Sequence, residues 1–156
     1  MAVFEYRQAE EIRDIFARHR VRYLFIGKSG AILLGYPDTT QDADLFVEKT
    51  MENGRALAIA LRELGFALTP EQEQDLERGR DFVQLKNGPF DLDLIFAPDG
   101  IETFSDAWAK HLEVEGFPVC HIDDIIASKE AANRKKDRES LERLRAFREY
   151  WRRQVR

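Results

Sequence analysis

In the first third of the chain stands Thr40-Gln41-Asp42-Ala43-Asp44-Leu45-Phe46-Val47, in which two aspartates introduce an apolar run. We interpret residues 43–48 as a buried strand, and side chains two apart on a strand face the same way. Asp42 and Asp44 should therefore present two carboxylates side by side, although aspartate is depleted in strands and neighbouring carboxylates repel each other. Carboxylate oxygens suit Mg²⁺. The pair predicts a divalent-metal site, with a strand edge or turn carrying two exposed aspartates as the alternative.

A second pair of aspartates follows in Phe90-Asp91-Leu92-Asp93-Leu94-Ile95-Phe96. If this strand lies beside the first, one of its aspartates supplies a third carboxylate. We favour Asp93, because the apolar residues around it make an unpaired charge costly there, whereas Asp91 stands nearer the preceding turn. Three convergent carboxylates can hold two divalent ions about 3.5–4 Å apart, an arrangement used for in-line phosphoryl transfer.

A glycine-containing turn, Ile26-Gly27-Lys28-Ser29-Gly30, joins a predicted strand to a predicted helix. Such a junction offers backbone N–H groups to a phosphate. Gly27 lets the backbone approach closely, Ser29 can donate a hydroxyl and Lys28 can neutralise charge. A strand–helix turn without a ligand is the alternative. The Gly-Lys-Ser string is not a P-loop, because Arg22 stands where the first glycine of that motif is required.

The remaining elements follow from hydrophobic periodicity and turn residues. Helices are predicted at residues 5–19, 29–34, 52–64, 103–111, 123–133 and from 137 onward through Val155. Strands are predicted at residues 21–26, 43–48, 66–68, 82–86 and 90–96, and the last two form a hairpin that turns at Asn87-Gly88. Residues 112–120 are predicted to form a small hairpin or loop, and residues 70–78 a surface helix or loop. This order predicts one α+β (mixed α/β) domain over residues 1–156, with a helical tail at about 122–156.

Composition limits the class of protein. The 156 residues are 44% hydrophobic and 34% charged, with a net charge of -5, which predicts a soluble globular domain. We expect no membrane span and no signal peptide, and the single cysteine, Cys120, suits a reducing cytoplasm. Residues 129–156 carry 11 Lys or Arg against 5 Asp or Glu. This basic segment could lie beside an anionic substrate or form a solvated helix face.

Together these residues resemble the DNA polymerase β-like nucleotidyltransferase superfamily, and within it the small bacterial branch that includes abortive-infection nucleotidyltransferase toxins. The similarity covers most of residues 21–145 and is carried by Ile26-Gly27, Leu34-Gly35-Tyr36-Pro37, Thr40-Gln41-Asp42-Ala43-Asp44-Leu45, Ile125-Ile126-Ala127-Ser128-Lys129, Arg134, Lys136-Asp137, Leu141 and Leu144. Two positions depart from the family pattern: Lys28 replaces a small residue, and Asp38 stands where a basic residue is common.

The resemblance implies a nucleotidyltransferase-like mixed sheet with flanking helices, and metal-dependent transfer of a nucleoside monophosphate from an NTP to an acceptor. Asp93 would also assist deprotonation of the acceptor hydroxyl, and Thr40 would orient its loop. The resemblance implies that Mg²⁺ or Mn²⁺ binds Asp42, Asp44 and Asp93. It also implies that the NTP phosphates bind Gly27, Lys28, Ser29, Thr40, Lys129 and Arg134.

Several alternatives stay open at this point. The acceptor could be RNA, a protein hydroxyl or a small molecule such as an antibiotic. Lys28 and Asp38 motivate a second hypothesis, a catalytically inactive binding module that has a partner protein in a toxin–antitoxin or regulatory pair. Lys129 and Arg134 could instead belong to an ion-pair network on a helix surface. A nucleic-acid-binding protein that uses the basic tail is the third hypothesis.

Overall fold

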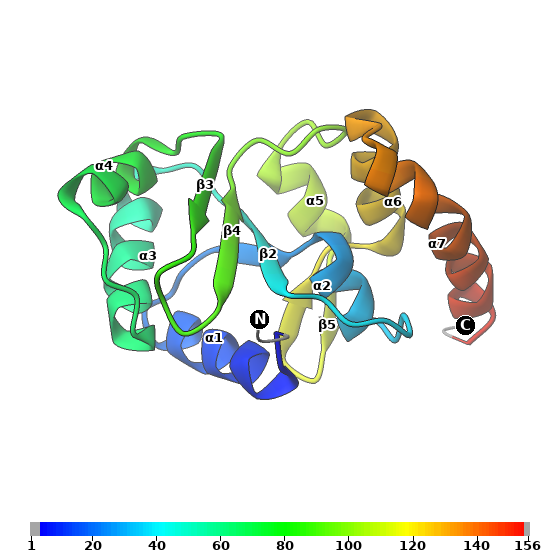
Figure 1. The fold of residues 1–156 in the computed structure, drawn as a ribbon, viewed down its shortest axis with the longest axis horizontal. Coiled ribbons are helices and arrows are strands. Elements are labelled where there is room, and N and C mark those ends of the chain that lie inside the picture. The colour runs from blue at the N-terminus through cyan, green and yellow to red at the C-terminus, as the bar shows by residue number, and fades with distance from the viewer. Residues whose placement is uncertain (1–3, 155–156) are drawn as a thin grey trace.

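The computed structural model describes residues 4–154, which form a mixed α/β fold (Figure 1). The expected fold class is confirmed. The elements in chain order are α1 (Tyr6–Arg18), β1 (Tyr23–Phe25), α2 (Gly27–Leu33), β2 (Asp42–Val47), α3 (Met51–Leu64), α4 (Pro70–Arg78), β3 (Phe82–Leu85), β4 (Asp91–Ile95), α5 (Phe104–Lys110), β5 (Leu112–Val114), β6 (Phe117–Val119), α6 (Ile122–Ala132) and α7 (Lys135–Gln154). Figure 1 shows α3 and α4 at one end, α6 and α7 at the other, and the sheet between them.

A six-stranded mixed sheet, ordered β3-β4-β2-β1-β6-β5, organises the molecule. Strand β2 runs antiparallel to β1 and parallel to β4. In the β2–β4 pair, Asp42 is aligned with Asp91 and Asp44 with Asp93. Because aligned residues of neighbouring strands face the same side, the two aspartate pairs of the sequence meet on one face of the sheet.

Two apolar clusters stabilise this arrangement. The larger one surrounds the sheet, where alternate residues of β2 and β4 such as Leu45 and Leu92 are fully buried. The smaller cluster joins α2, α6 and α7 through Ala31, Tyr36, Ile122, Ile126, Leu141, Leu144 and Phe147. The helical tail therefore packs on the helix that follows β1. The predicted helical position of Val155 lies outside the described residues.

Three local predictions differ from the structure. The predicted strand at residues 66–68 is wrong: Phe66 is buried with its ring 5.3 Å from that of Phe90. The β3–β4 hairpin is confirmed, but five residues connect its strands and Gly88 is not among the glycines with positive φ. Glycine is needed there because a Cβ would lie 2.2 Å from Phe66 Cδ1. The cap of α6 is His121, not Asp123.

Among residues 4–154, no helix combines the length and the apolar character that crossing a bilayer requires.

Candidate active site

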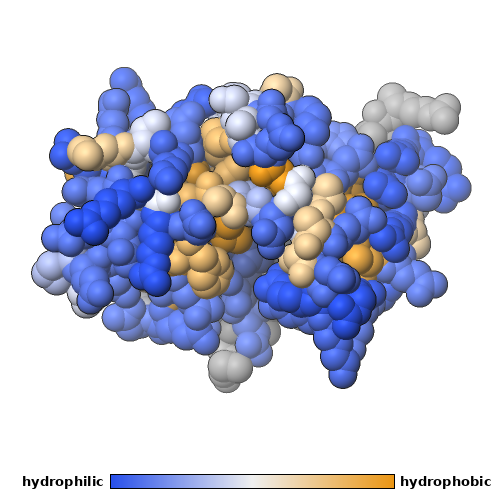
Figure 2. Space-filling model, turned by 90° about the horizontal axis from the view of Figure 1, so that it is seen from above, coloured by the Kyte–Doolittle hydropathy of each residue, from blue (hydrophilic) through white to orange (hydrophobic). Residues whose placement is uncertain are grey.

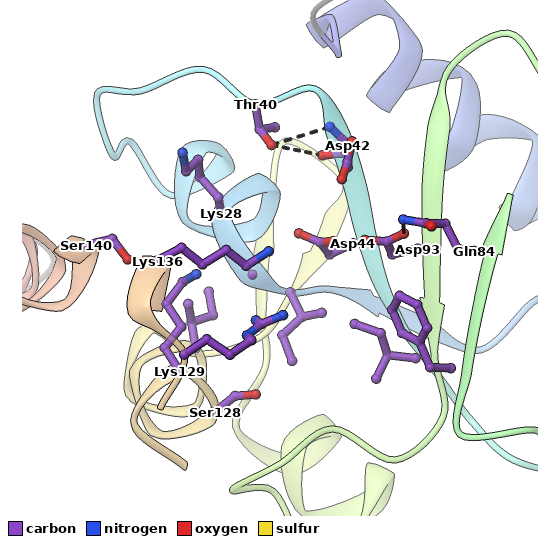
Figure 3. Close-up of a pocket in the computed structure, with 16 residues that line it drawn as sticks. Lys28, Thr40, Asp42, Asp44, Gln84, Asp93, Ser128, Lys129, Lys136 and Ser140 are labelled. Atoms are coloured by element: carbon purple, nitrogen blue, oxygen red, sulfur yellow. Dashed lines mark hydrogen bonds between the residues drawn. The ribbon is translucent and has the colours of Figure 1, made fainter. Parts of the chain in front are cut away.

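A cavity of about 450 Å³ lies between the carboxylate face of the sheet and the α6–α7 junction (Figure 3). Most of the residues selected from the sequence line it. They are Gly27, Lys28, Thr40, Asp42, Asp44, Asp93, Lys129 and Arg134. Ser29 and Asp91 are not in its lining. The fold thus brings together side chains that are almost 110 positions apart in the chain.

The carboxylates of Asp44 and Asp93 lie side by side on neighbouring strands (Figure 3). Burial and the Asp93 carboxylate raise the pKa of Asp44 well above its usual range. The pKa of Asp42 is also raised, first by burial and then by Asp93 and Asp91. These carboxylates repel one another, and the nearby lysines offset the repulsion only in part, so that the group favours binding of a cation.

No group of three or more His, Cys, Asp or Glu side chains in residues 4–154 has the geometry to hold a metal ion alone. The adjacent pair Asp44 and Asp93, with Asp42 one pleat away, still fits Mg²⁺. This ion typically binds one or two carboxylates and completes its shell with water and substrate phosphate oxygens. The carboxylates therefore suit an ion that takes some of its ligands from the protein and the others from a nucleotide.

Gly27 and Ser29 fix the position of Asp44 from two sides. Gly27 has a φ of 65°, and a Cβ on it would lie 2.5 Å from Asp44 Oδ2. Ser29 is buried; its hydroxyl donates to the Ile26 carbonyl and accepts from the Asp44 N–H, each at 3.0 Å. Ser29 thus fastens the first turn of α2 to β2 behind the cavity, while Thr40 Oγ1 lies 3.4 Å from the Asp42 N–H nitrogen.

Positive charge reaches the cavity from α6 and α7. Figure 3 shows Lys129 and Lys136 extending from this side toward Asp44. Asp137 is fully buried and accepts from Arg134 Nε at 2.7 Å, and Lys129 Nζ lies 3.6 Å from its other oxygen. Desolvation lowers the pKa of Lys129. The two alternatives from the sequence therefore coexist, since Lys129 and Arg134 both form ion pairs and line the cavity.

We expect Asp137→Asn to lower the free energy of unfolding by about 3 kcal/mol at pH 7, because it removes a fully buried carboxylate and leaves the largely buried Lys129 and the more exposed Arg134 without their counter-charge. Burial acts to raise the pKa of Asp137, but the hydrogen bonds from Arg134 outweigh it and hold the pKa below its usual range. A carboxylate of this kind stabilises above the unfolded-state pKa of about 3.9, and the contribution is lost as the pH falls through the folded-state pKa. Urea unfolding at pH 7 and pH 3 should show the difference shrinking in acid.

Asp123→Asn is the matched control, since Asp123 also pairs with two arginines, Arg148 and Arg152, but is 44% exposed. Its loss should cost less than about 1 kcal/mol. Equal effects of the two substitutions would contradict a special role for the buried carboxylate.

The two departures from the family pattern form a single ion pair. Lys28 Nζ lies 3.4 Å from Asp38 Oδ2, and Arg143 lies 3.8 Å from the same oxygen. The Thr39 N–H and then the Lys28 charge lower the pKa of Asp38. Figure 3 shows the Lys28 side chain pointing away from Asp44. The negative charge of Asp38 is therefore compensated, and Lys28 is held away from the carboxylates.

Sequence reasoning missed several lining residues: Phe82, Gln84, Ile95, Ser128, Lys136 and Ser140. Gln84 Nε2 donates to Asp93 Oδ1 at 3.0 Å. The alternation of β3 carried this signal, because once β3 and β4 form a hairpin, Phe82 and Gln84 share a face with Asp93. Ser128 and Lys136 stand in the segments that carry the resemblance but received no role there, and Ser140 carries no pattern that distinguishes it from surface residues.

A scan of protein-family models and a search of curated proteins both found no match. Among solved structures, the chain is similar to the lincomycin-bound crystal structure of the lincosamide antibiotic adenylyltransferase LnuA. The TM-score is 0.63 at 13% sequence identity, with 92% of this chain and 98% of that chain covered. This similarity confirms the nucleotidyltransferase-like fold that the sequence implied.

Proposed function

We propose that the protein is a metal-dependent nucleotidyltransferase that moves a nucleoside monophosphate from an NTP to the hydroxyl of an acceptor. The observation that carries this proposal is the pairing of Asp44 with Asp93 across parallel strands, facing Lys129 and Lys136 across one cavity. Carboxylates on one side and cations on the other suit a substrate that brings both a divalent ion and phosphates. The fold similarity to an adenylyltransferase supports the same reaction class.

In this proposal Asp42 and Asp44, with Asp93, hold Mg²⁺ or Mn²⁺, which would neutralise the carboxylates and polarise the α-phosphate. Asp93 accepts the proton of the acceptor hydroxyl. The new bond joins the acceptor oxygen to the α-phosphorus, and the bond from that phosphorus to pyrophosphate breaks. Lys129, with Arg134 and Lys136, balances the charge of the departing pyrophosphate.

The remaining residues orient these groups. The backbone of Gly27 opens α2 beside Asp44 and offers N–H groups at the cavity wall. Thr40 holds the Asp42 backbone. The sheet and the helical tail work as one domain in this scheme, because each supplies one side of the cavity. The free, buried Cys120 suits a reducing compartment and thus supports a cytoplasmic location.

The acceptor class we test first is a small-molecule hydroxyl, since the similar solved structure holds an antibiotic acceptor. The experiment incubates the protein with each α-³²P-labelled NTP, Mg²⁺ or Mn²⁺, and one of lincomycin, an aminoglycoside, tRNA or cell extract. Label should pass to an acceptor from α-labelled but not from γ-labelled NTP, with release of pyrophosphate, and EDTA should stop it. Labelling from γ-labelled NTP would overturn the proposed reaction.

The second candidate function is a binding module of this fold without catalysis, paired with a partner protein as in the toxin-type branch. The Lys28–Asp38 ion pair motivates this alternative, because it engages a lysine beside the proposed phosphate-binding site. Calorimetry with each NTP and Mg²⁺ separates the two. Binding together with transfer supports the enzyme, whereas the absence of both favours the module.

We expect Asp38→Asn to strengthen binding of a non-hydrolysable ATP analogue with Mg²⁺ by about fivefold, because it removes a negative charge and releases Lys28 for phosphate. Calorimetry at fixed ionic strength measures the change. Asp123→Asn, which removes a carboxylate outside the cavity lining, should leave the affinity unchanged. Weaker binding by Asp38→Asn would show that the ion pair supports the nucleotide site instead of restraining it.

A further inference from the structure

The carboxylate face of the sheet continues into an apolar surface. Across the β3–β4 hairpin, Gln84 is aligned with Asp93 and Phe82 with Ile95. Each strand therefore carries a polar residue at the carboxylates and an apolar one two positions away. On the next strand, β2, the corresponding residue Phe46 is buried under Phe104, with ring centroids 5.2 Å apart.

Phe82 has no such cover. It is 50% exposed and lines the cavity. Among residues 4–154, the other large hydrophobic side chains exposed to this extent, such as Tyr150, do not line this cavity. Seen from above, apolar side chains gather near the middle of the molecule with polar surface on both sides (Figure 2). Hydration of an exposed phenyl group in a polar cavity is unfavourable, and contact with an apolar ligand would relieve it, which points to a role in binding.

The direction of the proposed reaction determines whether the acceptor or the leaving pyrophosphate lies beside Phe82. In an in-line displacement the incoming oxygen and the leaving group lie on opposite sides of the phosphorus. The cations of α6 and α7 place the leaving pyrophosphate on the β1 side of Asp44. The acceptor oxygen then approaches from the Asp93 side, and the next strand in that direction is β3, with Gln84 and Phe82.

Charge at this end does not favour a polyanion. Helix α4 packs on β3, and its carboxylates Glu73, Asp75 and Glu77 pair with Arg62, Arg80 and Arg55, so that the helix adds no excess of positive charge at this end. The cationic side chains of the cavity come from α2 and from the α6–α7 junction, on the other side of Asp44. An acceptor with phosphates near its reactive hydroxyl would have its cationic partners among the lining residues on the far side of Asp44, whereas an uncharged acceptor needs none.

We propose that Phe82, together with Ile95, forms the acceptor platform, and that the acceptor is a small hydroxyl compound with an uncharged, flat apolar group beside the reacting oxygen. Gln84 is a positioning residue, since its hydrogen bond holds Asp93 where that hydroxyl arrives. The assignment rests on the proposed function, because transfer chemistry defines which side of Asp44 receives the acceptor.

The test uses matched probes: phenyl β-D-glucoside, methyl β-D-glucoside and glucose 6-phosphate. They share sugar hydroxyls and differ in an aromatic group or a charge. Saturation-transfer NMR titrations with the whole protein give a dissociation constant for each. We expect the phenyl glucoside to bind about tenfold more tightly than the methyl glucoside, and glucose 6-phosphate to bind more weakly than either.

The variants locate the binding. Phe82→Ala should weaken phenyl glucoside about tenfold and leave methyl glucoside unchanged, while Phe82→Trp should restore it. Tyr150→Ala is the control, since Tyr150 is similarly exposed but lies outside this cavity. Equal binding of the two glucosides, or tight binding that survives Phe82→Ala, overturns the platform. Binding needs no nucleotide, so the labelled-NTP experiment can fail while this one succeeds, and the reverse.

Discussion

Asp44→Asn is expected to reduce nucleotidyl transfer at least about 1,000-fold while leaving the protein folded. Asp44 is central to the site: it is aligned with Asp93, half-buried at the cavity wall, and in close contact with the Gly27 backbone. In the proposed reaction, loss of its charge removes a ligand of the metal ion. Stabilisation of the transition state by such an ion is worth several kcal/mol, and each 1.4 kcal/mol is a factor of about ten in rate. The initial rate of α-label transfer with saturating NTP measures the effect.

Thermal unfolding distinguishes this loss of function from a loss of fold. Without metal, Asp44→Asn should melt at or above the temperature of the unaltered protein, because the substitution relieves repulsion between Asp44 and Asp93. Mg²⁺ with an NTP should raise the melting temperature of the unaltered protein only. Asp91→Asn is the control, since Asp91 lies on the same face outside the cavity lining and should keep full activity. An active Asp44→Asn enzyme would exclude the mechanism.

Gly27→Ala is expected to lower transfer about 100-fold and to lower stability by about 2 kcal/mol, through two effects at one position. The φ of 65° strains any side chain, and the added Cβ would lie 2.5 Å from Asp44 Oδ2. The carboxylate must then move, and displacement of a catalytic group by about 1 Å can cost 100-fold in rate. Transfer kinetics and urea unfolding measure the two effects.

Gly35→Ala separates them. Gly35 also has a positive φ, 111°, but the nearest atoms to an added Cβ are those of the Phe147 ring, at 3.9 Å. This variant should lose stability from backbone strain and keep its rate of transfer. If Gly35→Ala lost as much activity as Gly27→Ala, backbone strain alone would explain both losses, and the contact between Gly27 and the Asp44 carboxylate would not matter for activity.

The sequence predicted the features that depend on short-range pattern. Alternation placed each aspartate pair on one face of a strand, and the parallel β2–β4 register then aligned Asp44 with Asp93. The sequence could not decide the role of Ser29, because hydroxyls at helix starts occur both in ligand sites and in structural hydrogen bonds. In the structure its hydroxyl bonds to backbone groups of Ile26 and Asp44. Only the spatial approach of α2 to β2 decides between the two.

Long-range contacts explain the other differences. At Gly88 the pattern indicated a tight turn, whereas the glycine is required by Phe66, a residue 22 positions earlier. Lys28 and Asp38 were separate departures in the sequence and became one ion pair once the loop after α2 folded back on its first turn. In each case the deciding partner lies too far along the chain for periodicity to show it.

The position of β3 at the margin of the sheet has an evolutionary consequence. Asp44 lies on an inner strand between two neighbours, where substitutions disturb packing on both sides, whereas Phe82 lies half exposed on a strand with a single partner. Exchanging an exposed side chain typically changes stability by less than about 0.5 kcal/mol. If Phe82 contacts the acceptor as proposed, a lineage could therefore change its acceptor by drift at this position without disturbing the strands that carry the aspartates.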